Sequence, residues 1–134
     1  MTKLIDVEGI GETYAQKLKD AGVPTMESLL KQGSTPAGRK EIAEKSGITP
    51  KLILEWVNHV DLFRIKGVAS EYADLLEEAG VDTVPELAQR VPENLFKKLI
   101  EINQQNRYVR RAPSLAMVAS WVEQAKQLPR IVQY

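Results

Sequence analysis

The chain has 134 residues, 43% hydrophobic and 27% charged, so it can bury a sizeable core in one compact domain or in two small fused ones. It has no cysteine and a single histidine, His59, which excludes disulfides, thiolate metal sites and multi-histidine metal sites. Its 18 basic and 18 acidic residues give a formal net charge of zero, so any contact with nucleic acid needs a local basic patch.

The N-terminal stretch MTKLIDVEGIGETYAQ lacks the basic start and the unbroken apolar core of a signal peptide. No apolar run approaches the roughly 18–20 residues that span a bilayer. These features predict a cytoplasmic protein without a membrane partner.

Two stretches of the chain resemble each other: 7–23, VEGIGETYAQKLKDAGV, and 65–81, IKGVASEYADLLEEAGV. At an offset of 58, nine of the 21 positions that begin at residue 9 are identical, and they are apolar residues, glycines, a tyrosine and a threonine. The second half is longer by a stretch around NQQNRYV. We therefore predict a tandem duplication, with halves at 1–63 and 64–134 that pack as one compact unit. The identical residues in the first half are Gly9, Tyr14, Ala15, Leu18, Ala21, Gly22, Val23, Thr25 and Leu29.

Helical signals follow one another along the chain. Apolar residues of GETYAQKLKDAGV recur at three- and four-residue steps, and Gly22 stands where that helix ends. Thr25 is predicted to cap MESLLKQ, and Thr83 to cap VPELAQR in the same way. Thr35-Pro36 and Thr49-Pro50 open PAGRKEIAEKS, which closes at Gly47, and PKLILEWVNHVDLF; Pro92 opens ENLFKKLIEINQQ and Pro113 opens SLAMVASWVEQAKQL.

No segment alternates apolar and polar residues with β-branched enrichment, so we expect no sheet. The predicted fold is all-α, with about eight or nine short helices. Trp56 and Trp121 lie in apolar stripes and are expected in the core, and His59 at an interface or the edge of the core.

Residues 7–15 carry the pattern hydrophobic-x-Gly-hydrophobic-Gly-x-x-x-Ala. This pattern resembles the helix-hairpin-helix motif of DNA repair, recombination and replication proteins. Its glycines would allow a tight turn and close approach, Ile10 would anchor the turn in the core, and Ala15 would let two helices cross closely. Over nearly its full length, the chain also resembles an uncharacterised bacterial family of tandem helix-hairpin-helix-like domains, through both hairpins, GRKEIAEKSGI and WVNHVDLFRI.

The resemblance implies that main-chain amides at the hairpins hold DNA phosphates, because each turn leads into a helix N-terminus. The first hairpin departs from the DNA-binding form, since Glu12 follows its second glycine and Asp6 and Glu8 flank the turn. In the second hairpin Ala69 replaces that glycine and is expected to restrict the turn, whereas nearby Arg64, Lys66 and Ser70 favour phosphate.

The densest basic cluster is NRYVRRAP, predicted to connect two helices, with Tyr108 among its arginines and Lys97 and Lys98 before it. It suits single- or double-stranded nucleic acid, or else helix capping and solubility. Arg39, Lys40 and Lys45 form a weaker patch, which we interpret as a solvated face.

Neither a nucleophile with a base, nor a phosphate-binding loop, nor a metal or cofactor motif is recognisable, so we predict a non-enzyme without cofactor or metal. The leading hypothesis is a sequence-nonspecific nucleic-acid-binding module. The alternative is a protein-interaction or scaffolding module with a degenerate DNA site. The candidate phosphate-binding residues are Gly9, Ile10, Gly11, Arg64, Lys66, Gly67, Val68, Ala69, Ser70, Arg107, Arg110 and Arg111.

Overall fold

A computed structural model describes residues 3–7 and 9–134, and all regular structure within these ranges is helical, as predicted. It comprises one short 3-10 turn and eight α-helices among those residues. Their bounds are η1 Leu4–Asp6, α1 Glu12–Asp20, α2 Met26–Gln32, α3 Pro36–Ser46, α4 Pro50–Leu62, α5 Ser70–Glu78, α6 Val84–Ala88, α7 Pro92–Gln105 and α8 Leu115–Gln127. In the part of the chain that is described, no helix has the length and apolar character needed to cross a membrane.

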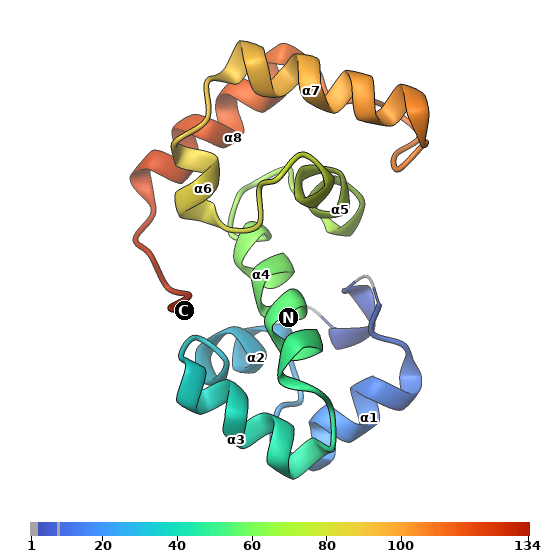
Figure 1. The fold of residues 1–134 in the computed structure, drawn as a ribbon, viewed down its shortest axis with the longest axis vertical. Coiled ribbons are helices and arrows are strands. Elements are labelled where there is room, and N and C mark those ends of the chain that lie inside the picture. Colours follow the sequence, from blue (N-terminus) through green and yellow to red (C-terminus); the bar gives the residue numbers. More distant parts are fainter. Residues whose placement is uncertain (1–2, 8) are drawn as a thin grey trace. The chain divides into compact units, whose positions relative to one another are not determined.

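The chain divides into two compact units (Figure 1). Unit 1 comprises Met1–Asp61 together with Ile131–Tyr134, and unit 2 comprises Leu62–Arg130. In unit 1, α1 packs against η1 and α3, and α2 packs against α3. In unit 2, α8 lies beside α6 and α7, and α5 packs against α7. Each unit therefore has its own helical core.

The turns that precede α1 and α5 have the same backbone hydrogen bonds at an offset of 58 residues. Each turn contains two successive hydrogen bonds, in which an amide donates to the carbonyl of the residue three positions earlier. The hydrogen bonds that end α1 and α5 also match at this offset. The turn bonds are Val7 to Leu4 and Ile10 to Val7, both 3.0 Å, and Ile65 to Leu62 and Val68 to Ile65, both 3.1 Å. The two hairpins thus share one backbone geometry.

A tryptophan closes each hairpin against its first glycine. Gly9 has a φ of 90°, and a Cβ placed there would lie 3.3 Å from Nε1 of Trp56. Tyr14 packs on the same indole, with ring centroids 5.1 Å apart. Unit 2 repeats the arrangement, since a Cβ on Gly67 would lie 3.1 Å from Nε1 of Trp121. Both indoles are buried, at 3% and 2% exposure, which confirms their predicted place in the core.

The second position of the turn does not require glycine, contrary to the sequence-based expectation. Gly11 has φ −90° and ψ −175°, and a Cβ there would meet nothing within 4 Å. Ala69 has nearly the same extended conformation, so it does not restrict its turn. Ala15 is only half-buried, whereas Ala73, its counterpart in unit 2, is fully buried; the close helix crossing expected at Ala15 stays a prediction.

Most of the predicted helix ends are confirmed, and two are wrong. The hydroxyls of Thr25 and Thr35 accept the expected amides, and Gly47 ends α3 in the left-handed conformation. Thr83 precedes α6 without such a bond; the carboxylate of Glu86 accepts instead, from the Asp82 amide at 3.0 Å. Pro113 does not open α8, since Ser114 is its N-cap and accepts from the Met117 amide.

The segment Ile131–Tyr134 belongs to unit 1, which no sequence signal indicated. The Gln133 amide donates to the Ser34 carbonyl at 2.7 Å, and the Gln133 carbonyl accepts from Arg39 Nη2 at 2.7 Å. Arg39 Nη1 donates to the Gly33 carbonyl at 2.8 Å. Arg39 is buried, and its desolvation lowers the pKa of the guanidinium from its ordinary value. A buried cation thus fastens the C-terminal segment through main-chain carbonyls.

We expect Gly9→Ala to lower the free energy of unfolding by about 1–3 kcal/mol, because alanine must adopt a positive φ while its methyl group meets the indole of Trp56. Gly11→Ala is the matched control and should change it by less than about 0.5 kcal/mol. Urea unfolding of both variants checks this, and equal losses would contradict the assignment of the two glycines.

Arg39→Ala should lower the free energy of unfolding by roughly 2–3 kcal/mol, because the buried Gly33 carbonyl and the part-buried Gln133 carbonyl are deprived of a charged donor. Lys40→Ala, which truncates the exposed neighbour, should change it by less than about 0.5 kcal/mol. Hydrogen exchange should also show faster exchange of the Gln133 amide in the Arg39 variant only, and unchanged exchange would refute the fastening role.

Candidate nucleic-acid interface

Helix α5 begins without a side-chain cap of its own. Its N-cap residue, Ala69, carries no acceptor, and the helix runs for nine residues from Ser70 to Glu78. Helix α1 begins in the same way behind Gly11. The amides of a first helical turn have no partner within the helix and carry the positive end of its dipole. Both hairpins therefore direct donors and positive potential toward the space before their helices.

Gln124 of α8 holds the turn of the second hairpin. Its Oε1 accepts from the Lys66 amide at 2.8 Å, and its Nε2 donates to the Lys66 carbonyl at 3.2 Å. The Lys66 side chain remains exposed beside the turn. Sequence reasoning missed Gln124, although it lies three residues after Trp121 and hence on the same face of α8.

The arginine cluster lies in the connection between α7 and α8, as predicted. Asn103 organises this loop, because its Oδ1 accepts from the Tyr108 and Val109 amides at 2.9 and 3.1 Å. Arg107 Nη2 donates to the Arg110 carbonyl at 3.0 Å. The side chains of Arg107, Arg110 and Arg111 are all exposed. The loop therefore presents three guanidinium groups from a hydrogen-bonded backbone.

Two tyrosines attach this loop to α5. The Tyr72 hydroxyl, in the first turn of α5, donates to the Arg111 carbonyl at 3.0 Å. The Tyr108 hydroxyl donates to Oε1 of Glu78, near the other end of α5, at 2.9 Å. The Tyr72 ring is itself fixed, since it packs on Trp121 with centroids 5.2 Å apart. The second hairpin and the arginine cluster, which the sequence predicted as separate features, therefore both adjoin α5.

Tyr108 has a raised pKa, first because its hydroxyl is bonded to the Glu78 carboxylate, and then through desolvation and the charges of Glu78 and Asp74. Its ring also packs against the core of unit 2. The interleaved aromatic of the basic cluster is therefore a loop anchor.

Three other predicted site residues, Arg64, Ile10 and Val68, have side chains that are engaged or buried within the fold. Arg64 Nη1 donates to the Pro129 carbonyl at 2.8 Å, so this side chain fastens the chain that follows α8. The side chains of Ile10 and Val68 are buried, at 3% and 5% exposure, so only their main chain can meet a ligand.

The first hairpin has acidic surroundings. Glu12 and Asp6 are exposed at its turn, and Glu8 lies outside the described residues. The α3–α4 connection of unit 1, at 47–49, is short and contains no arginine. Unit 1 therefore lacks the counterpart of the arginine loop.

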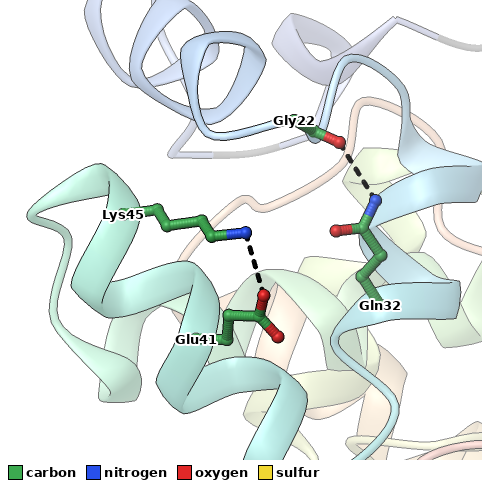
Figure 2. Close-up of polar contacts among 4 residues, drawn as sticks. All are labelled: Gly22, Gln32, Glu41 and Lys45. Atoms are coloured by element: carbon green, nitrogen blue, oxygen red, sulfur yellow. Dashed lines mark hydrogen bonds and ion pairs between the residues drawn. The ribbon is translucent and has the colours of Figure 1, made fainter.

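The weaker patch on α3 does not gather its cations. Arg39 is buried, as described above, and Lys45 pairs with Glu41 one turn earlier, at 2.8 Å (Figure 2). The hydrogen bond and charge of Lys45 lower the pKa of Glu41. Across from this pair, Gln32 Nε2 donates to the Gly22 carbonyl at 3.0 Å and braces the α1–α2 turn (Figure 2).

Residues 8–128 match a family described as "Domain of unknown function (DUF4332)". Because this match extends over most of the chain, the protein belongs to that family. Searches of curated proteins and of solved structures found no match to the chain.

The attachment of the loop should depend on pH. Because the folded-state pKa of Tyr108 is raised, its anchoring bond is intact below the ordinary tyrosine pKa of about 10 and is lost as pH rises through the folded-state value. Hydrogen exchange cannot follow this at high pH, so we would use the fluorescence of a probe on an Arg107→Cys variant. The transition should vanish in Tyr108→Phe and persist in Tyr134→Phe; its persistence in Tyr108→Phe would contradict the anchor.

Proposed function

We propose that this protein binds the backbone of duplex nucleic acid, without sequence specificity, through unit 2. The observation that carries the proposal is the hydrogen bond from Tyr72 to the Arg111 carbonyl. It joins the arginine loop to the first turn of α5, which has no side-chain cap from Ala69 and has the exposed Lys66 in the turn before it. Main-chain donors at a helix end suit phosphate oxygens, and so do the exposed arginines of a loop that is bonded to the first turn of that helix.

The expected contacts divide by chemistry. First-turn amides of α5 would hold one phosphate, as the resemblance to helix-hairpin-helix proteins implies, and Lys66 would add charge beside it. Arg110 and Arg111 would fork to further phosphates along the strand. Contacts of this kind position a protein on nucleic acid and carry no base information, which gives nonspecific binding.

The tyrosines favour a duplex over a single strand. Proteins that bind single strands without sequence preference stack bases on accessible aromatic rings. Here Tyr72 is packed on Trp121, and Tyr108 packs against the core of unit 2 and donates to Glu78. Because both rings are already packed within unit 2, we expect the arginine loop to gain its affinity mainly from contacts with the phosphate backbone of the nucleic acid.

The residues of the turns favour unit 2 over unit 1, although the exposed Glu71 lies in the first turn of α5 and Arg64 is bonded to Pro129. At the offset of 58 residues, Asp6 corresponds to Arg64 and Glu12 to Ser70. Unit 2 contains ten basic and nine acidic residues, so its affinity would come from their placement and not from an overall field. We expect the first hairpin to contribute packing and little binding.

The proposed activity is non-enzymatic and needs no cofactor or metal. The tandem helix-hairpin-helix arrangement and a cytoplasmic location remain predictions from the sequence. A second candidate function is a protein-interaction module, which the near neutrality of both units favours.

The test is fluorescence anisotropy with labelled duplex and single-stranded DNA of equal length at about 50 and 200 mM salt. We expect a duplex Kd of about 10⁻⁴–10⁻⁶ M that weakens steeply with salt. Lys66→Glu and the double variant Arg110→Glu/Arg111→Glu should weaken binding. They should also reduce the slope of log K against log salt by about one for each phosphate that the variant no longer binds.

Lys31→Glu and Lys51→Glu make the same charge change at exposed positions of unit 1 and serve as controls. Equal effects of the control and test variants would show a nonspecific charge response. Absence of duplex binding at the lower salt concentration would refute the proposal.

A further inference from the structure

Unit 1 carries an open groove of about 670 Å³ on the side of α1 that faces η1. Its apolar lining comes from Leu4, Ile5, Ala15 and Pro24, and Glu12 and Lys19 stand on its rim. Ile5 is 51% exposed there, which is unusual for a large apolar side chain next to a core. The volume lies in the range of sites that take a few side chains or a small ligand.

The corresponding surface of unit 2 is covered. Ala15 is half-buried, whereas Ala73, its counterpart at the offset of 58, has no exposed surface. Ile5 corresponds to Phe63, which packs against the core cluster of unit 2. The same hairpin geometry thus leaves an apolar strip open in unit 1 and closes it in unit 2.

We propose that the groove on unit 1 binds an acidic amphipathic helix of a partner protein. The groove follows Glu12, Ala15, Gln16 and Lys19, positions that form one straight line on the surface of α1. Its exposed apolar surface comes from Ala15 on this line and from Ile5 and Pro24 beside it. Ala15 lies at the centre of this line, and its small side chain allows a second helix to approach closely. An apolar helix face laid into such a groove is a recurring mode of recognition.

The charges of the rim specify the partner. Lys3 and Lys19 are exposed and form no ion pair with any residue in the described ranges 3–7 and 9–134. Glu12 is the single acidic residue of the lining, and the exposed Asp6 and Asp20 are outside it. A partner helix therefore needs carboxylates opposite the two lysines, flanking its apolar face. This site lies in unit 1 and uses none of the residues proposed to contact nucleic acid, so its test is independent of that proposal.

The test uses the ¹⁵N-labelled full chain and three synthetic peptides. The first is a helix with leucines on one face flanked by glutamates, the second has lysines in place of the glutamates, and the third has the composition of the first with its leucines scattered. The first peptide should shift the amide resonances of Ala15, Gln16 and Lys19, and bind about fivefold more tightly for each favourable charge pair than the second. The scattered peptide should shift none of them.

Charge reversal in the protein makes the test specific. Lys19→Glu should reverse the preference, so that the lysine peptide binds more tightly than the glutamate peptide. Lys3→Glu should also lower the affinity for the glutamate peptide. Lys31→Glu, on α2, is the matched control and should leave both affinities unchanged, and thermal melts should show each variant folded.

Equal binding of the glutamate and lysine peptides, shifts outside the groove, or no binding at all would overturn the proposal. A concentration-dependent dimer in sedimentation that Lys19→Glu dissociates would also overturn it, because the occupant would then be a second copy of the chain.

Discussion

The packing of a tryptophan indole against a glycine at positive φ is the constraint on which the rest of each unit depends. In unit 1 the indole of Trp56 lies against Gly9, and in unit 2 that of Trp121 lies against Gly67. A Cβ at either glycine would lie 3.1–3.3 Å from the indole nitrogen, closer than ordinary van der Waals contact, and its residue would have to adopt a positive φ. A tyrosine ring from the following helix then packs on the same indole, so turn, helix and tryptophan are fixed together.

This packing also determines where the polar groups of unit 2 point. Gln124 lies one helical turn after Trp121 and is thereby placed at the Lys66 main chain, which it bonds on both sides. Tyr72, held by the indole, directs its hydroxyl to Arg111. The apolar contact therefore supports the proposed phosphate site without touching any ligand.

The two hairpins share a backbone and differ in what surrounds it. Unit 2 has a nine-residue α7–α8 connection, 106–114, that carries the arginines along α5, whereas the α3–α4 connection of unit 1 has three residues. Unit 1 instead leaves one side of α1 open, with Ile5 exposed beside it. Both proposals rest on these differences, because a shared turn serves as scaffold and its surroundings supply the chemistry.

The amino-acid pattern was enough to predict the helical fold, most helix ends, the burial of Trp56 and Trp121, and the position of the arginine loop between two helices. These are local properties, since apolar periodicity, proline, glycine and cap residues act within a few positions along the chain. It misjudged Thr83 and Gly11 because cap choice and the room around a glycine depend on side chains that the local pattern does not specify.

Which distant groups come into contact could not be predicted from local patterns. The bond from Tyr72 to Arg111 joins residues 39 positions apart, and Arg39 reaches Gln133 across 94 positions. Such contacts follow from how helices pack and not from spacing along the chain. For the same reason the arginine loop and the second hairpin were predicted as separate candidates, and folding placed them on one helix.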